Sequence, residues 1–340
     1  MTRAFVLLTA LPPTIGHLQL VRFASELEDE VHVLVCTQPG EPFPAERVEA
    51  IRQAAGDFPG VHVHGLHRTI PQEPADTPEF WPMWRRILRE HGLQDGDTIV
   101  ASEPYGAALA ETAGGVFVPY DVERSITPVR AVDVRHDPVG QFADILAEFQ
   151  PVLRRRLTVL GAESTGKTTL SRQLAEVLPG HWLPEWARPY LEGTPTPDVD
   201  HERMHVIWRA QRALQRSAGS LRDRAFIVQD TDLFATVGYW EMWDPATVPE
   251  GLRADASADR SDLYLITRSD IPFEHDPLRY GGEVRETSDG YWIALVERFG
   301  LPYRVIESTS AEDRLAEARE LSLDLFGRTS SIAFERQGSH

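Results

Sequence analysis

The chain has 340 residues, 42% hydrophobic and 25% charged, which is ordinary for a globular protein and long enough for two domains. Its formal net charge of −18 argues against a general affinity for nucleic acid or anionic membranes. Its one cysteine, Cys36, excludes an internal disulfide framework and a multi-cysteine metal site; the apolar run around it predicts a buried strand thiol. No run reaches the roughly 18 apolar residues of a membrane helix, and residues 4–11 lack a signal-peptide cleavage pattern, so we expect a cytoplasmic protein.

Short apolar runs alternate with helix-like segments along the whole chain, a pattern typical of parallel α/β domains. In the first half we expect strands at 4–8, 30–36, 61–65, 98–101 and 115–118, and helices at 16–28, 44–55, 78–91 and 105–112. In the second half we expect strands at 156–160, 181–183, 225–229, 263–267 and 303–306, and helices at 166–178, 201–222 and 310–326. We therefore predict a domain at 1–138, a connecting helix at 139–155, a second domain at 156–326 and a disordered tail at 327–340.

A complete phosphate-binding loop, G-x-x-x-x-G-K-[ST], joins the first strand of the second domain to its first helix. Its backbone N–H groups and the helix N-terminus would face the phosphates of a nucleotide. Lys167 would reach the β- and γ-phosphates, and the Thr168 hydroxyl would bind Mg²⁺. The residues expected to bind ATP here are Gly161, Glu163, Ser164, Thr165, Gly166, Lys167, Thr168 and Thr169.

Acidic and aromatic residues follow the next strands. The strand at 225–229 runs into Asp230, a candidate Mg²⁺ neighbour, and Asp232, a candidate contact of a substrate hydroxyl. Glu185 follows the preceding strand, where it would accept a hydroxyl proton or hold a ribose, and the aromatic rings just after it would stack on a planar base. Farther on, Arg279 and Arg285 in a proline-bounded loop predict a lid that neutralises charge in the transition state.

Residues 157–310 resemble the ribosylnicotinamide kinase domain of the NadR family. The matching pieces are the phosphate loop, the segment 185–190, the strand end at Asp230, Trp240 and the stretch 270–279. The resemblance implies transfer of the γ-phosphoryl of ATP to the 5′-hydroxyl of nicotinamide riboside, with Lys167, Asp230 and Glu185 as catalytic candidates. It leaves open which carboxylate activates the hydroxyl. The riboside would be bound by Glu185, Trp186, Arg188, Tyr190, Asp232 and Trp240.

The start of the chain resembles the [HT]-x-G-H signature of the nucleotidyltransferase superfamily, with Thr14 first and His17 last. Elements resembling the family's arginine-bearing helix, its Ser-Glu-x-Tyr-Gly turn and its Asp-x-x-Arg element follow in order. The resemblance implies a Rossmann-like nucleotidyltransferase domain in which His17 donates to phosphate and orientation and charge stabilisation drive adenylyl transfer. The residues implied for ATP and nicotinamide mononucleotide (NMN) are Thr14, Gly16, His17, Arg47, Trp81, Trp84, Glu103, Tyr105, Gly106, Arg124, Arg130 and Arg135.

The late Ile-Ser-x-Thr-x-Ile-Arg motif of that family is altered. In the preferred register Arg135 is retained, but Arg130 stands at the serine position and Val132 at the threonine position. Leu8 also replaces an early glycine. Another register, 125–130, restores the hydroxyls but loses the flanking matches.

The sequence thus predicts an α/β enzyme of NAD salvage with a nucleotidyltransferase domain followed by a P-loop kinase domain that has a parallel sheet. The implied ligands are nicotinamide riboside, NMN, ATP and NAD, with Mg²⁺ as cofactor and ATP as co-substrate. We expect neither DNA nor membrane as a partner, and no helix-turn-helix module, because the first strand begins near Met1; a homo-oligomer is left open. Three alternatives stay open: a kinase with a non-catalytic nucleotide- or NMN-sensing N-terminal domain, a regulatory P-loop ATPase or GTPase, and the same architecture acting on another pyridine or nucleoside.

Overall fold

The computed structural model describes residues 1–71, 77–193, 199–270 and 285–329. They form two compact units, which meet in sequence between Val152 and Leu153. Each unit is built on a five-stranded sheet in which every strand pair is parallel. The predicted α/β class with parallel sheets is confirmed. Within the described residues, no helix combines the length and the apolar character needed to cross a membrane.

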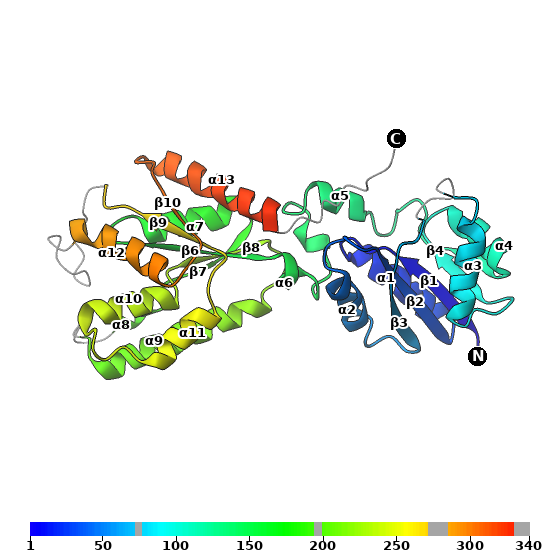
Figure 1. The fold of residues 1–340 in the computed structure, drawn as a ribbon, viewed down its shortest axis with the longest axis horizontal. Helices are drawn as coiled ribbons and strands as arrows, with labels where there is room; N and C mark the ends of the chain where they lie inside the picture. Colours follow the sequence, from blue (N-terminus) through cyan, green and yellow to red (C-terminus); the bar gives the residue numbers. More distant parts are fainter. Residues whose placement is uncertain (72–76, 194–198, 271–284, 330–340) are drawn as a thin grey trace. The chain divides into compact units, whose positions relative to one another are not determined.

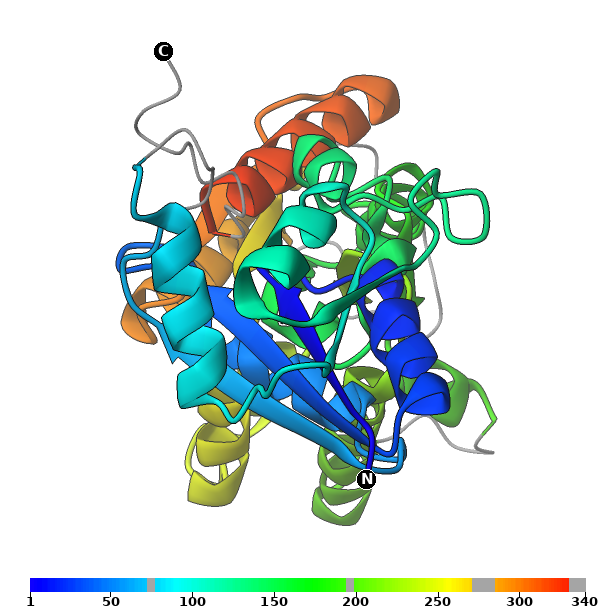
Figure 2. The ribbon, with the colours of Figure 1, turned by 90° about the vertical axis from the view of Figure 1, so that its right-hand side faces the viewer.

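The N-terminal unit has the strand order β3-β2-β1-β4-β5. Figure 2 shows α1 (blue) and α3 (cyan) on opposite faces of this sheet. The central strand β1 is an almost unbroken apolar run because it is covered on both faces. Its elements are β1 (Arg3–Leu8), α1 (Ile15–Leu27), β2 (Glu30–Thr37), α2 (Pro44–Ala54), β3 (Val61–His67), α3 (Phe80–Glu90), β4 (Thr98–Ala101), α4 (Tyr105–Ala113), β5 (Val116–Pro119), α5 (Ala131–His136) and η1 (Phe142–Asp144).

The C-terminal unit has the strand order β10-β9-β6-β8-β7. In Figure 1, α13 lies along one face of this sheet and α9 and α11 lie along the other. Its elements, with the short α6 at the junction, are α6 (Gln150–Leu153), β6 (Arg155–Gly161), α7 (Lys167–Val177), β7 (Gly180–Leu183), α8 (Ala187–Glu192), α9 (His201–Ser217), η2 (Ala218–Ser220), β8 (Phe226–Asp230), α10 (Leu233–Trp243), α11 (Glu250–Ala258), β9 (Leu263–Thr267), α12 (Arg285–Arg298), β10 (Tyr303–Val305) and α13 (Ala311–Thr329).

The predicted connecting helix at 139–155 is wrong. Only the short η1 and α6 are helical there, and Ile145 has an extended backbone. The apolar residues are spaced as in a helix, but the chain is instead tied to the N-terminal unit: Ile145 bridges Thr14, and the Leu146 N–H donates to the Pro13 carbonyl. The predicted tail also begins too early, because residues 327–329 continue α13; the rest of it lies outside the described residues.

Arg47 of α2 organises the carboxyl end of the first sheet from inside the core. Its side chain is completely buried and forms an ion pair with Glu41 at 2.7 Å. Its remaining N–H groups donate to the carbonyls of Thr9 and Ala10, after β1, and of Cys36, in β2. A buried charge of this kind is tolerated because it is paired and fully hydrogen-bonded.

We therefore expect Arg47→Met to destabilise the N-terminal unit by about 3–5 kcal/mol, since it leaves the Glu41 carboxylate buried without its partner. Scanning calorimetry of the full chain should show one transition lowered by roughly 10 °C. The matched control is Arg52→Met on the same helix, whose ion pair with Glu49 is half exposed on both sides and contributes little. Equal, small shifts for the two variants would contradict the structural role of Arg47.

Candidate active sites

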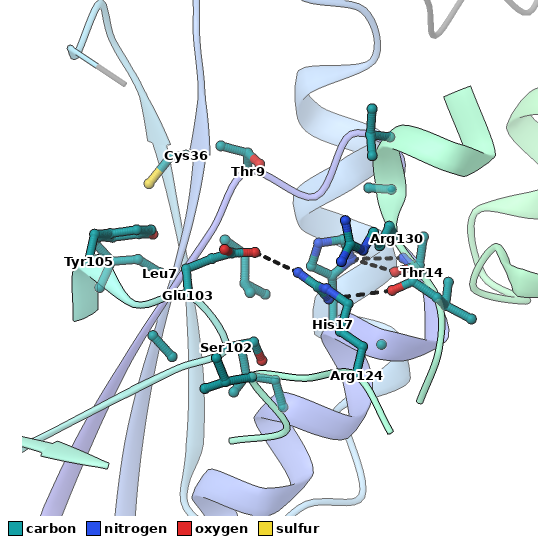
Figure 3. Close-up of a pocket in the computed structure, with 18 of the residues that line it drawn as sticks. Leu7, Thr9, Thr14, His17, Cys36, Ser102, Glu103, Tyr105, Arg124 and Arg130 are labelled. Carbon is teal, nitrogen blue, oxygen red and sulfur yellow. Dashed lines mark hydrogen bonds and ion pairs between the residues drawn. The ribbon is translucent and has the colours of Figure 1, made fainter. Parts of the chain in front are cut away.

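A cavity of about 400 Å³ opens at the carboxyl ends of β1 and β4 in the N-terminal unit. The strand order reverses between these two strands, and ligands of open α/β sheets bind at such a switch point. The cavity is lined by Leu7, Leu8, Thr9, Thr14, Gly16, His17, Leu20, Cys36, Phe80, Trp84, Ala101, Ser102, Glu103, Tyr105, Leu109, Val122, Arg124, Val129, Arg130, Ala131, Val132 and Arg135. Figure 3 shows the polar side chains gathered around it.

His17 and Thr14 form one unit at the N-terminus of α1. Both the backbone N–H and the hydroxyl of Thr14 lie within hydrogen-bond distance of His17 Nδ1, at 3.0 and 2.8 Å. A backbone N–H only donates, so Nδ1 must be the unprotonated nitrogen, and the neutral ring carries its proton on Nε2. Burial, and then the charges of Arg124, Arg47 and Arg135, lower the pKa of His17 to about 4. At neutral pH the imidazole is therefore a neutral hydrogen-bond donor.

Three arginines line the same cavity, namely Arg124, Arg130 and Arg135. Glu103 pairs with Arg124 at 2.5 Å, and Arg135 donates to the Leu11 carbonyl at 2.5 Å. Three guanidinium groups around one cavity suit a polyphosphate, because each presents several N–H donors with a permanent positive charge.

The other side of the cavity is apolar. Phe80 and Trp84 of α3 and Leu109 of α4 belong to the core cluster beneath it. Cys36 is buried in β2, as the sequence predicted, and burial raises the pKa of its thiol to about 12. Two further polar residues line the cavity, and both directly follow a strand: Ser102, the serine of the predicted Ser-Glu-x-Tyr-Gly turn, and Thr9, which sequence reasoning missed.

Three residues expected in this site lie outside the cavity lining: Arg47, Trp81 and Gly106. The N–H groups of Arg47 donate to backbone carbonyls within the core. Trp81 packs edge-on against Phe80. A Cβ at Gly106 would lie 2.5 Å from the Phe117 ring, so this glycine allows α4 to pack on the sheet. The direct ligand roles expected for Arg47 and Gly106 are therefore corrected to structural ones, whereas the role expected for Trp81 stays a prediction.

The altered phosphate motif lies at the cavity itself. Arg130 directly precedes α5, and Val132 in the first turn of α5 is 40% exposed; both line the cavity. The guanidinium of Arg130 thus stands at the serine position of the motif, and the apolar side chain of Val132 stands at its threonine position. A valine side chain makes no hydrogen bond to phosphate.

The phosphate loop of the C-terminal unit connects β6 to α7, at the point where the second sheet reverses its strand order. A Cβ at Gly161 would lie 2.4 Å from the Thr267 carbonyl, so only glycine fits there. The Thr165 hydroxyl lies 2.7 Å from that of Thr267 and donates to the Ala162 carbonyl, which fixes the loop from within. Thr165 therefore offers a phosphate its backbone N–H and not its side chain.

Lys167 begins α7 and donates from Nζ to the Ala162 carbonyl at 2.7 Å. It is the only lysine in the sequence, among 34 basic residues. Arg314 of α13, which sequence reasoning missed, also binds the phosphate loop. Its Nη1 donates to the Thr165 carbonyl at 3.0 Å, and its Nη2 forms an ion pair with Asp270.

Asp230, the last residue of β8, lies beside the loop. Burial raises the pKa of this carboxyl, while a hydrogen bond with Thr168 and the charges of Lys167 and Arg188 act in the opposite direction. Its Oδ1 is buried and, within the described residues, has no hydrogen-bond partner. The next residue, Thr231, has φ of 67°, an uncommon conformation for a β-branched residue, and local strain of this kind is typical of functional sites.

Glu185 faces the same group of charges from the end of β7. Burial and the neighbouring charge of Asp230 raise its pKa to about 7, against the opposing effects of Lys167 and Arg188. Tyr239 of α10 was not predicted as a site residue. Burial, and then the charges of Glu185, Glu163 and Asp230, raise the pKa of its hydroxyl, so the hydroxyl lies in the same region as these carboxyls. The structure therefore brings together the loop, Asp230, Glu185 and Arg188, as predicted.

Two residues expected to bind the riboside are engaged elsewhere. Both oxygens of Asp232 are used: Oδ1 caps α10 by accepting from the Phe234 and Ala235 N–H groups, and Oδ2 accepts from the Tyr264 hydroxyl at 2.8 Å. Trp240 is completely buried, with its Nε1 donating to Thr247. The expected ligand contacts are therefore not available to Asp232 and Trp240.

Trp186 and Tyr190 remain exposed enough to meet a ligand. Their rings stack on each other with centroids 5.0 Å apart. Of the two predicted lid arginines, Arg279 lies outside the described residues, and the described part of Arg285 is its backbone at the start of α12.

The comparisons with known proteins agree with this division. A family model described as an AAA domain matches residues 156–314. The trifunctional NAD biosynthesis/regulator protein NadR of Escherichia coli (strain K12) is 22% identical over 337 residues, covering 92% of this chain and 80% of the relative. The chain is therefore homologous to NadR.

Two solved structures of NadR proteins share the fold. One, in complex with NAD and AMP-PNP, has a TM-score of 0.61 at 20% identity and covers 98% of each chain. The other, in complex with NR, has a TM-score of 0.60 at 20% identity and covers 99% of this chain and 98% of that one. The predicted fold, two successive α/β domains each built on a parallel sheet, is confirmed.

Because the pKa of Glu185 is raised, replacing this residue with a neutral one should stabilise the folded chain, and the gain should depend on pH. Between the ordinary glutamate pKa of 4.5 and about 7, the folded chain holds a proton that the unfolded chain has lost. The free energy of unfolding therefore falls as pH rises through this window. Above the window, the whole cost of ionising the buried carboxyl reduces stability. Glu185→Gln should raise the melting midpoint of the C-terminal unit by about 3–6 °C at pH 8 in a chelating buffer, but hardly at pH 4.5. A lower midpoint at pH 8 would mean that the ionised carboxylate is well compensated.

Proposed function

We propose that this NadR homologue catalyses two steps of NAD salvage, one in each unit. The C-terminal unit transfers the γ-phosphoryl group of ATP to nicotinamide riboside and yields NMN. The N-terminal unit transfers the adenylyl group of a second ATP to NMN and yields NAD and pyrophosphate. The observation that carries the proposal is that each sheet has basic side chains and a helix N-terminus at its own switch point, in a chain homologous to NadR along almost its full length.

In the kinase step, the phosphate loop holds the triphosphate through backbone N–H groups, and Lys167 neutralises charge on the β- and γ-phosphates. Thr168 and Asp230 fit a Mg²⁺ ion, since they lie hydrogen-bonded together and Asp230 Oδ1 is buried without a partner among the described residues. Mg²⁺ takes one or two carboxylates plus phosphate oxygens, so no larger cage of acids is needed. Bound there, the ion would neutralise charge on the phosphates.

Glu185 is then the residue that accepts the proton of the attacking hydroxyl. A general base works best when its pKa is close to the operating pH, and the pKa of Glu185 is raised to about 7. The 5′-oxygen forms a bond to the γ-phosphorus, the bond to the β,γ-bridging oxygen breaks, and ADP leaves. Arg188, whose charge acts on both carboxylates, would stabilise the negative charge that builds up on the transferring group.

In the adenylyl step, an oxygen of the NMN phosphate attacks the α-phosphorus of ATP and pyrophosphate leaves. No side chain is acylated or phosphorylated; the unit aligns two anions and offsets their charge. His17 donates from Nε2, and Arg124, Arg130 and Arg135 contact phosphate oxygens. The apolar wall with Trp84 would receive the nicotinamide ring.

One observation favours a second candidate function. Val132 lines the cavity at a position where the nucleotidyltransferase motif carries a hydroxyl, so one phosphate contact is missing. In the alternative, the N-terminal unit binds nucleotide or NMN as a sensor and only the kinase unit turns over. Cytoplasmic location and the absence of DNA binding remain predictions from the sequence.

The two sites are tested by paired variants assayed on both reactions. Lys167→Ala should lower kcat/KM for riboside phosphorylation by about 10²- to 10³-fold and leave NMN adenylylation near its starting value. His17→Ala should give the reverse pattern. Because Lys167 carries the only side-chain amine, ATP-protected acylation of this residue provides an independent measure of loop occupancy.

Loss of both activities in a folded Lys167→Ala or His17→Ala variant would contradict the assignment of separate sites. Lys167→Arg serves as the matched charge control. It should still lose most kinase activity, because the planar guanidinium does not reproduce a compact ammonium group.

A further inference from the structure

Helix α9 places two buried glutamines one turn apart, Gln211 at 3% exposed and Gln215 at 0%. Gln215 is fully satisfied within the protein. Its Oε1 accepts from the Leu233 N–H at 3.0 Å, and its Nε2 donates to the carbonyl and carboxylate of Asp259, both at 3.3 Å. The burial of Gln215 is thus explained by its hydrogen bond, which connects α9 to the start of α10.

Gln211 is satisfied on one side only. Its Oε1 accepts from the Trp186 N–H at 3.2 Å, whereas its Nε2 is buried and has no hydrogen-bond partner among the described residues. The orientation of the amide is not arbitrary, because the Trp186 N–H only donates and so must face the oxygen. A buried donor left unsatisfied costs free energy, so its partner is expected to be something that the protein binds.

The surroundings of Gln211 indicate what that partner is. Trp186 directly follows Glu185, whose carboxyl interacts with the charges of Asp230, Lys167 and Arg188. Trp186 and Tyr190 pack against the core cluster that contains Ile207 of α9, one turn before Gln211. Gln211 therefore supports the segment to which the acceptor of the phosphoryl group is assigned. Another buried polar atom without a hydrogen-bond partner among the described residues is Asp230 Oδ1, on the phosphate side.

We propose that Gln211 is a substrate-binding residue whose Nε2 donates a hydrogen bond to an oxygen atom of the riboside. This inference rests on the proposed kinase function and adds to it a residue that selects the acceptor. One amide thus links two tasks: its oxygen fixes the backbone next to Glu185, and its nitrogen binds the molecule that Glu185 deprotonates. A site built to hydrogen-bond a substrate oxygen discriminates strongly against molecules that lack it.

Two variants separate these tasks in the full chain. Gln211→Met removes both hydrogen bonds at similar volume. Gln211→Glu keeps an oxygen for the Trp186 N–H but, when ionised, replaces the donor with a second acceptor. The control is Arg209→Gln, two residues earlier on the exposed face of the same helix. Binding of nicotinamide riboside is measured by calorimetry at pH 8, ATP affinity by titration, and folding by the melting midpoint.

We expect both Gln211 variants to bind the riboside about ten- to a hundredfold more weakly, with KM for the riboside raised and KM for ATP unchanged. Arg209→Gln should match the wild-type chain. Wild-type affinity in the folded Gln211→Glu variant would overturn the inference and leave Gln211 only its contact with Trp186. A wild-type chain that binds no riboside would overturn the proposed kinase function, and this inference with it.

Discussion

In both units, the strand order reverses at the first strand of the sheet, and this reversal fixes where chemistry can take place. Connections on either side of β1 and β6 leave in opposite directions, so a crevice remains beyond the carboxyl ends of these strands. The helix that follows each strand points its N-terminus toward that crevice, where unpaired N–H groups attract anions. Two sheets with this property in one chain provide two phosphate sites.

The second constraint is electrostatic. A chain with a net charge of −18 repels polyanions in general, so positive charge must be concentrated where a nucleotide binds. The N-terminal cavity does so with three arginines beside a neutral His17. The C-terminal unit does so with the single lysine of the sequence, opposite two carboxyls whose pKa values are raised. Burial disfavours the ionised form of both acids, and the charge of Asp230 further disfavours ionisation of Glu185, which suits proton transfer near neutral pH.

Much of the fold could be predicted from local pattern. Strands buried on both faces are short apolar runs, and all ten strands of the described residues coincide with predicted ones to within about two residues. Helix α10 was missed because it is buried on nearly every side and therefore has no polar face to give a period. The prediction of a helix at 139–155 failed for the opposite reason: helical spacing of apolar residues is present, but contacts with Pro13 and Thr14, far away in sequence, override it.

The candidate sites show the same limit. Residues in contiguous motifs, such as Lys167 and His17, could be found because the backbone of a strand–turn–helix fixes their positions. Asp232 and Arg47 resembled site residues in sequence, but their partners, Tyr264 and Glu41 among them, are visible only in three dimensions. Tyr239 and Gln211 lie on helices whose packing brings them to the site, and no local signal marks them.

The central question is whether the N-terminal unit, with Arg130 and Val132 in its phosphate motif, catalyses adenylyl transfer. The direct measurement is product analysis of the purified chain incubated with NMN, ATP and Mg²⁺, without riboside. We predict that NAD and pyrophosphate appear in equal amounts. Riboside phosphorylation by the same preparation, without NAD formed from NMN, would contradict it and leave a kinase joined to a binding domain.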